Sequence, residues 1–203
     1  MITLVSGIYR SGTSMMMRIL HAGGMPCLYK EHSDSDNPGG YFETGGRFNF
    51  HLHPEQMFEA EGKALKIILP PTKKRIDSLP FGHEYRCILM QRPSEEVLIS
   101  QLTVAINRGC SVMSKSFIER FEIKHGNTQI ETDHVVTDAS ELLVRTADEA
   151  SLELGASVMA VPYHDVLKEP REVAEAIVKF LGVPLDIGAM IRQVDQKLYR
   201  NRK

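Results

Sequence analysis

Short apolar runs alternate along the chain with stretches in which apolar residues recur at helical spacing. The apolar runs are residues 2–5, 64–69, 86–91 and 158–163. The stretches with helical spacing are residues 14–21, 94–108, 138–154 and 170–181. Continuous apolar runs of this length are typical of strands buried on both faces. The alternation predicts an α/β fold of three layers, in which helices flank a mostly parallel central sheet.

Glycine and proline mark the ends of two of the expected helices. Gly23 and Gly24 follow the first helix and Gly182 follows the last, as expected at helix C-termini. Pro170 stands where the last helix should begin, a position at which its missing N–H breaks no helical hydrogen bond. Local signals therefore predict where these two helices begin or end.

The composition is that of an ordinary globular chain. Its 203 residues are 42% hydrophobic and 25% charged, and we expect them to form one domain, residues 1–203. The formal net charge of -2 provides no field that would attract nucleic acid or an anionic membrane, so neither is an expected partner. No apolar run approaches ~18 residues, which predicts that no helix spans a membrane.

The N-terminus and the cysteines favour a cytoplasmic location. The first apolar run is short and has no basic residues before it, unlike a signal peptide. Cys27, Cys87 and Cys110 are odd in number and form no CxxC pair. Neither a disulfide framework nor a structural zinc site is therefore expected. The sequence favours no particular oligomeric state.

A glycine-containing loop joins the first expected strand to the first expected helix. Its residues are Gly7-Ile8-Tyr9-Arg10-Ser11-Gly12-Thr13-Ser14. In this context successive backbone N–H groups and the helix N-terminus can bind a phosphate. The spacing nearly matches the nucleotide-kinase loop GxxxxGK(S/T), but Thr13 replaces the Lys, and Arg10 is the cation of the loop. The alternative is a simple glycine turn with a solvated Arg10.

With an arginine at that place, the loop resembles the phosphosulfate loop of the sulfotransferase family. The family motif reads K/R-S-G-T-S/T, and this chain has Arg10-Ser11-Gly12-Thr13-Ser14. The family, which includes bacterial sulfotransferase-like proteins, has a P-loop-type fold. It transfers a sulfuryl group from 3′-phosphoadenosine 5′-phosphosulfate (PAPS) to a hydroxyl or an amine. The resemblance implies PAPS as co-substrate, no required metal, and residues 10–14 as part of the PAPS site.

A second motif follows the third expected strand. In the family this strand ends in Arg-x-Pro, with a Ser eight residues after the Arg; here Pro93 follows Arg92 directly, and Ser100 lies eight positions on. A guanidinium fork and a hydroxyl can together hold a dianionic phosphate. The resemblance implies that Arg92 and Ser100 bind the 3′-phosphate of PAPS. The alternative is a surface Arg at a strand end and a hydroxyl on a helix face.

Weaker matches extend the resemblance over most of the chain. Residues 36–43 are similar to a D-x-N-P-x-G-Y-x-E block, and residues 163–182 to a Y-x-D-L…P…F-L-G tail. The C-terminal residues around Tyr199 resemble the segment near the adenosine. The Lys-Gly loop of larger family members is not visible. The resemblance implies that Tyr163, Tyr199 and Arg200 contribute to nucleotide binding.

Sulfuryl transfer needs cationic help for the leaving oxygen and a base for the proton of the acceptor. We assign the first role to Arg10. For the base we favour Glu43, which follows Gly-Gly-Tyr-Phe in a polar loop. Relatives use either Glu or His at this step, so His32, His51 and His53 are rival candidates.

Structural alternatives to these assignments stay open. Glu43 is also well placed to cap a helix that begins near Gly45. His51 and His53 flank a single residue, but no third ligand follows at a recognisable spacing, so we expect a surface pair and no metal site.

Lys66 interrupts the apolar run at residues 64–69. Relatives often place a Lys near the end of this strand, where it touches the sulfuryl group, so the resemblance implies a catalytic Lys66. A Lys that reaches out from the edge of the sheet explains the pattern equally well. Both interpretations stay open.

Three functional classes fit these motifs. The first is a PAPS-dependent sulfotransferase. The second is a P-loop small-molecule kinase, which would need a Lys at the place of Thr13. The third is a non-catalytic nucleotide-binding protein, which would be favoured if Glu43 and every His lay far from Arg10. We expect residues 25–60 and 110–137 to form the acceptor site or a lid. Because these segments are short, a small molecule or a carbohydrate is the expected acceptor.

Overall fold

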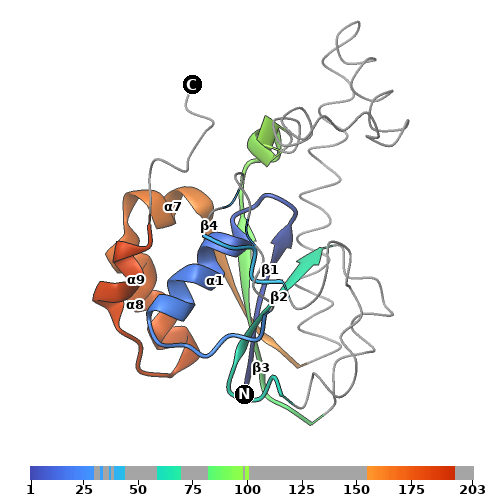
Figure 1. Cartoon of the computed structure of the whole chain (residues 1–203), viewed down its shortest axis with the longest axis vertical. Coiled ribbons are helices and arrows are strands. Elements are labelled where there is room, and N and C mark those ends of the chain that lie inside the picture. The colour runs from blue at the N-terminus through green and yellow to red at the C-terminus, as the bar shows by residue number, and fades with distance from the viewer. Residues whose placement is uncertain are drawn as a thin grey trace, which may run out of the picture.

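The computed structural model describes residues 1–29, 33, 37, 39–43, 59–69, 82–97, 99–100 and 155–194. Its strands are β1 (Ile2–Ile8), β2 (Ala64–Leu69), β3 (Tyr85–Gln91) and β4 (Ser157–Pro162). They form one sheet in the order β2-β1-β3-β4, and every neighbouring pair is parallel (Figure 1). The predicted α/β fold around a parallel sheet is confirmed.

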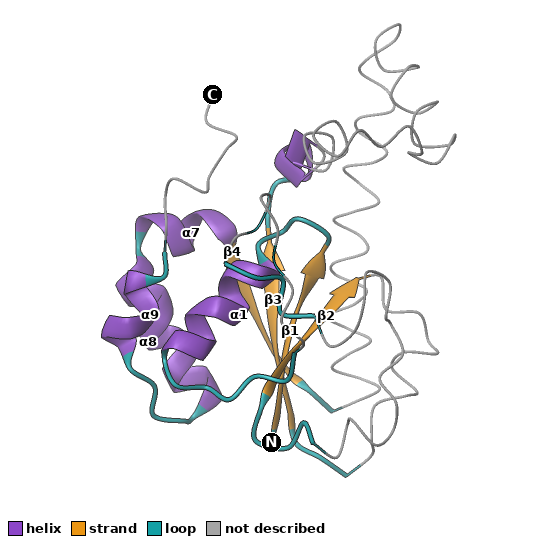
Figure 2. Ribbon diagram, in the orientation of Figure 1, coloured by secondary structure: helices purple, strands orange, loops and turns teal. Residues whose placement is uncertain are grey.

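Four of the described helical segments gather on one side of this sheet. They are α1 (Thr13–Ala22), α7 (Tyr163–Lys168), α8 (Pro170–Leu181) and α9 (Ile187–Arg192). Figure 2 shows them together to the left of the strands. Residues 94–97 and 99–100, which follow β3, are also helical.

Side chains of β1 and β3 alternate between two apolar clusters, one on each face of the sheet. Val5 and Ile88 pack in the first cluster with Leu20 of α1. Leu4 and Cys87 belong to the second cluster. All 7 residues of β1 are buried, as expected for a central strand that is covered on both faces. This burial holds the C-terminal ends of β1 and β3 side by side, and the site lies at those ends.

The glycine and proline signals mark the helix ends that the sequence predicts. Gly23 is the C-cap of α1, and its N–H donates to Ile19 O. The next residue, Gly24, has a left-handed φ of 95°. A Cβ on Gly23 would lie 2.7 Å from Met190 Cγ, so the missing side chain lets α9 approach α1 closely. Pro170 begins α8, and Gly182 ends it with a φ of 65°.

Some boundaries and two helices differ from the prediction. β1 extends to Ile8 rather than to residue 5, because residues 6–8 also pair with β2. β4 ends at Pro162, so Tyr163 opens α7 instead of closing the strand. Helices α7 and α9 have 6 residues each, and segments this short show no helical periodicity in a sequence.

Several predictions concern residues outside the described parts of the chain. These are the helix at residues 138–154, most of the helix at 94–108, the segment 110–137 and most of the segment 25–60. The domain organisation therefore stays a prediction. Among the residues that the structure describes, no helix is both long and apolar enough to cross a membrane.

Candidate functional site

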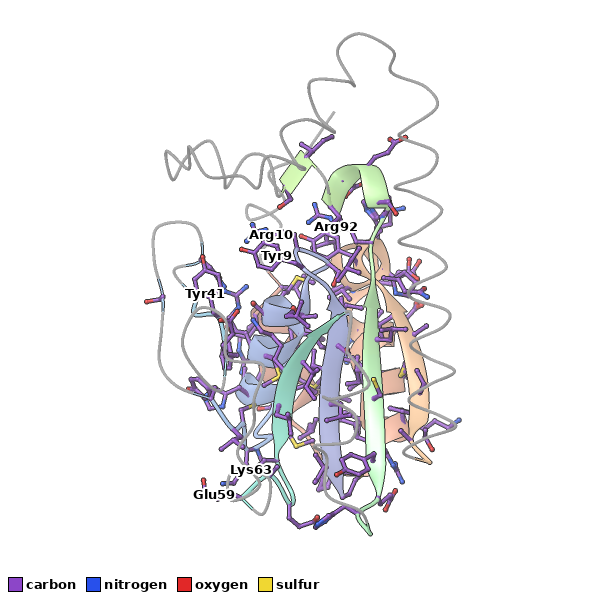
Figure 3. All side chains as sticks on the ribbon, turned by 90° about the vertical axis from the view of Figure 1, so that its right-hand side faces the viewer. Tyr9, Arg10, Tyr41, Glu59, Lys63 and Arg92 are labelled. Atoms are coloured by element: carbon purple, nitrogen blue, oxygen red, sulfur yellow. The ribbon has the colours of Figure 1, made fainter. Side chains whose placement is uncertain are left out.

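The candidate site lies at the edge of the sheet where the parallel strands end. From β1 the chain first forms β2 on one side of β1 and then β3 on the other side of β1. The order of the strands therefore reverses direction between β1 and β3. In open α/β sheets, ligands bind in the crevice outside such a switch point. Figure 3 shows Tyr9, Arg10 and Arg92 at this edge, far from Glu59 and Lys63 at the opposite end.

The loop after β1 has the backbone of an anion-binding turn. Arg10 and Gly12 have left-handed φ angles of 75° and 103°, and the N–H of Ser11 donates to Ile8 O at 3.0 Å. Gly12 is the N-cap of α1, and no side chain caps this helix. Alternating left- and right-handed residues turn successive N–H groups toward one point. The loop can therefore present N–H groups, with the N-terminus of α1, to a negative group.

Two positions of this loop require glycine, because neighbouring atoms leave no room for a Cβ. A Cβ on Gly12 would lie 2.6 Å from Tyr163 Cδ2, and a Cβ on Gly7 would lie 2.8 Å from Met90 O. Contacts under 3.0 Å force the neighbouring atoms to shift. The loop is therefore clamped between the end of β3 and the start of α7.

Arg10 contacts both members of the second motif. Its Nε donates to Ser100 Oγ at 3.0 Å, and its backbone carbonyl accepts from Arg92 Nη1 at 3.1 Å. The side chain of Arg92 is only 7% exposed, and Ser100 is buried. The alternative of a surface arginine at the strand end is therefore wrong, and the helical Ser100 has its hydroxyl in contact with Arg10. Residues about 90 positions apart meet in one cluster, as the shared ligand would require.

Arg92 is held by its surroundings on several sides. Its Cζ lies 4.4 Å from the centre of the Tyr163 ring, within the range of a cation–π contact. Its Nε donates to Glu96 Oε2 at 3.0 Å, and the other oxygen of Glu96 contacts His164 Nε2 at 2.8 Å. Burial raises the pKa of Tyr163 above its usual range, and the nearby Arg92 acts in the opposite direction. Tyr163 is thus a neutral platform beneath the guanidinium.

Lys66 points into the site rather than away from the sheet. Its side chain is 2% exposed, and Nζ donates to Ser14 Oγ at 3.1 Å, to Glu43 Oε1 at 3.2 Å and to the carbonyl of Tyr41. Burial lowers the pKa of Lys66, and Glu43 acts in the opposite direction. The interpretation of Lys66 as a side chain reaching out from a sheet edge is therefore wrong.

Glu43 reaches the same pocket from the segment 41–43. Ser14 Oγ donates to Tyr41 O at 3.2 Å, which ties this segment to the first turn of α1. The Glu43 side chain is 30% exposed, so its carboxylate can meet both Lys66 and a ligand. Whether Glu43 also caps a helix concerns residues outside the described parts.

One pocket contains most of the residues that the sequence singles out, together with others. The expected residues that line it are Arg10, Gly12, Thr13, Ser14, Glu43, Lys66, Arg92, Ser100 and Tyr163. The others include Tyr9, Met15, Arg18, Asn37, Tyr41 and Ile68. Sequence reasoning missed a role for Arg18. Its position one helical turn after Ser14 was the available signal, because such residues share a helix face.

The pocket is strongly cationic. Among the described residues that line it, the arginine and lysine side chains outnumber the carboxylates, since Arg10, Arg18, Lys66 and Arg92 face only Glu43. The guanidinium of Arg18 lies against Gly39, where a Cβ would be 2.9 Å from Arg18 Cζ. This set of groups fits a ligand that carries several negative charges.

Ser11 differs from its neighbours in the loop. The residue is fully buried, and its hydroxyl has no hydrogen-bond partner among the described residues. The hydroxyl lies close to Gly7, on the strand side of the loop, and Ser11 does not line the pocket. Ser11 can therefore act on a ligand through its backbone rather than through its hydroxyl.

Other candidate residues lie outside the described parts of the chain. They are His32, His51, His53, Tyr199 and Arg200. Within the described parts, no three His, Cys, Asp or Glu residues gather into a group that could hold a metal ion.

Two solved sulfotransferase domains are similar to this chain in structure. For the sulfotransferase domain from the curacin biosynthetic pathway, the TM-score is 0.53 and the sequence identity 13%, over 97% of this chain and 78% of that one. For the sulfotransferase domain from the Synechococcus PCC 7002 olefin synthase, the TM-score is 0.49 and the identity 17%, over 98% and 79%. No family model and no curated protein matches the sequence. The first likeness shows the fold, and the fold that the loop motif implied is thereby confirmed: the chain has the fold of a sulfotransferase domain.

Proposed function

We propose that the protein is an enzyme that transfers a sulfuryl group from PAPS to a hydroxyl or an amine of an acceptor. The observation that carries this proposal is the meeting of Arg10, Arg92 and Lys66 with Glu43 in one pocket of a sulfotransferase fold. The three cations fit a donor with two anionic groups. The Glu43 carboxylate fits a reaction in which a base must remove a proton from the acceptor.

The two motifs would bind the two anionic groups of the donor. Arg10 and the backbone of residues 11–14 would hold the phosphosulfate, and Arg92 with Ser100 would hold the 3′-phosphate. The hydrogen bond from Arg10 to Ser100 supports this assignment, because the two proposed anion subsites would then be neighbours. Adjacent subsites suit a nucleotide that carries both groups on one ribose.

In the transfer step, an acceptor oxygen or nitrogen forms a bond to sulfur as the bridging S–O bond breaks. The electron pair of that bond leaves on the 5′-phosphate, and 3′-phosphoadenosine 5′-phosphate (PAP) is the second product. Arg10 would stabilise the charge that builds on this phosphate. Glu43 would take the acceptor's proton, and Lys66 would hold the Glu43 carboxylate in place.

The other two classes receive less support. Thr13 lines the pocket at the place where a kinase loop needs its Lys. A protein that only binds nucleotide would not need a carboxylate beside the anion loop, yet Glu43 lines the same pocket as Arg10. A small molecule or a carbohydrate remains the proposed acceptor. Ile68 and Met15 supply apolar surface in the same pocket, on which part of it could rest.

Thermal unfolding separates the donor classes. We expect PAP without magnesium to raise the melting temperature, and ATP with magnesium to have little effect. In Ser100→Ala, the loss of a hydrogen bond to a charged group should weaken PAP binding by about ten-fold. Ser6→Ala is a matched control, because Ser6 Oγ donates to Ile67 O at 2.8 Å within the sheet and is not part of the pocket lining. Protection by ATP with magnesium but not by PAP would favour the kinase.

Transfer itself is tested with radiolabelled PAPS. The purified protein is incubated with labelled PAPS and a cell extract, and labelled products are identified by mass spectrometry. We expect a labelled small molecule or carbohydrate that is absent without the protein. Binding of PAP with no labelled product in any extract would instead support the non-catalytic class.

A further inference from the structure

We infer that Glu96 is a positioning residue that holds Arg92 ready for a phosphate, and that His164 holds Glu96. This inference rests on the proposed function, in which Arg92 binds the 3′-phosphate of the donor. Neither Glu96 nor His164 belongs to the described residues that line the pocket. They would therefore act on a ligand only through Arg92.

An arginine needs such support because its side chain is long. A free arginine side chain loses rotamer entropy when it is fixed, and a ligand must otherwise supply the corresponding free energy. Arg92 is already fixed by a carboxylate at Nε, a carbonyl at Nη1 and the Tyr163 ring beneath Cζ. The Arg10 carbonyl and Tyr163 belong to the site itself. Glu96 is a contact from a described residue that does not line the pocket.

Glu96 is in turn held by two neighbours. It lies four residues after Arg92, in the helical residues 94–97 that begin just after β3 ends. Its Oε2 accepts from Arg92 and its Oε1 contacts His164 Nε2, at 3.0 and 2.8 Å. His164 sits in the first turn of α7, after β4. The carboxylate therefore links Arg92 to α7, the helix that follows the neighbouring strand β4, and both of its oxygens have a partner.

A competing role for Glu96 makes the opposite prediction. A carboxylate paired with Arg92 also reduces the positive charge available to a phosphate. If that effect dominated, removing the charge would strengthen phosphate binding. The burial of Arg92 favours positioning, because a guanidinium that is 7% exposed and loses its charged hydrogen bond to Glu96 is expected to reorient.

The test compares PAP with adenosine 5′-phosphate, which lacks the 3′-phosphate, by isothermal titration. The dissociation constant of adenosine 5′-phosphate, divided by that of PAP, gives a ratio that measures how much the 3′-phosphate contributes to binding. In Glu96→Ala we expect the ratio to fall by about ten-fold, because Arg92 loses a charged hydrogen bond. In Glu96→Gln the ratio should stay at or above the wild-type value, since the amide oxygen can still accept from Arg92 Nε.

Two further variants complete the experiment. Glu175→Ala is the matched control, because Glu175 forms an exposed pair with Arg171 on α8 at the same four-residue spacing. It should leave the ratio unchanged. His164→Ala, which frees Glu96 but keeps its charge, should lower the ratio by about three-fold. Melting temperatures report whether each variant is folded, and His164→Ala serves as the test if Glu96→Ala fails to fold.

The outcomes separate this inference from the proposed function. A ratio that rises in both Glu96 variants would show competition and overturn the positioning role. An unchanged ratio in Glu96→Ala or, where that variant does not fold, in His164→Ala would also overturn it, although the donor assignment would stand. If the wild-type protein does not distinguish PAP from adenosine 5′-phosphate, the assignment of Arg92 to the 3′-phosphate fails, and the inference fails with it.

Discussion

Lys66 Nζ lies 3.2 Å from Glu43 Oε1 and donates also to Ser14 Oγ at 3.1 Å. A single strand residue therefore joins the carboxylate proposed as base to the helix turn that follows the anion loop. The ammonium is almost fully buried, whereas 30% of the Glu43 side chain is exposed. A ligand in the pocket would thus meet the carboxylate more readily than the ammonium. This favours Lys66 as the group that orients Glu43.

Replacing Glu43 tests its role as base. In Glu43→Gln the side chain keeps its size and can still accept from Lys66, but it cannot take up a proton at neutral pH. We expect transfer from labelled PAPS to fall by about 10²–10⁴-fold, the usual contribution of a general base. Affinity for PAP should stay within about two-fold, because no attractive charge for an anion is lost.

Glu84→Gln is the control for this substitution. Glu84 pairs with Arg86 at the start of β3, and its side chain is 60% exposed. It should change neither transfer nor binding. Full transfer activity in Glu43→Gln would exclude Glu43 as the base and direct attention to His32, His51 and His53.

The close fit around Gly12 makes a second prediction. Gly12→Ala combines a left-handed φ of 103° with a Cβ only 2.6 Å from Tyr163 Cδ2. We expect the free energy of unfolding, measured with urea, to fall by about 1–3 kcal/mol. Because the loop must shift, affinity for PAP should fall by about ten-fold, equivalent to about 1.4 kcal/mol.

Gly62→Ala separates backbone strain from the loss of the site. Gly62 has a φ of 72°, but a Cβ there meets nothing within 4 Å. We expect a loss of about 1 kcal/mol of stability from strain alone, with PAP affinity unchanged. Equal PAP affinity in the two alanine variants would contradict the role of Gly12 in shaping the anion loop.

The buried thiol of Cys87 makes stability depend on alkaline pH. Burial raises the pKa of Cys87 from 9.0 to about 12, so the thiol ionises in the unfolded chain before it does so in the folded one. The stabilising difference is complete below pH 9 and is lost as the pH rises above it. At pH 10, this thiol should lower the free energy of unfolding by about 1 kcal/mol relative to pH 7.

Urea unfolding of Cys87→Ala at both pH values measures this contribution. The variant is expected to be less stable at pH 7, because it leaves a small cavity in the second apolar cluster. Its loss of stability between pH 7 and pH 10 should nevertheless be smaller than that of the wild-type protein by about 1 kcal/mol. An identical pH dependence in both proteins would contradict the burial of the thiol.

The short-range features of the fold are predictable because they depend on neighbouring residues. The strand at residues 64–69 and the helix at 170–181 have the bounds that the apolar pattern, Pro170 and Gly182 predict. Both depend on contacts and backbone conformations within a few residues. The apolar pattern did not predict the short helices α7 and α9. For α9 the available signal was Asp186, whose side chain caps the helix by accepting from the N–H of Ala189 at 2.9 Å.

The sequence by itself determined the parallel α/β architecture, the glycine loop and the residue types that could bind an anion. Only the tertiary structure decided how those residues meet. Arg10 contacts Ser100 across 90 positions of the chain, and Lys66 turns inward to Glu43 rather than outward to solvent. Apolar periodicity reports which face of a strand is buried, but not which polar group a buried side chain will find there. That partner depends on segments brought alongside by the packing of the whole sheet, and no local pattern records it.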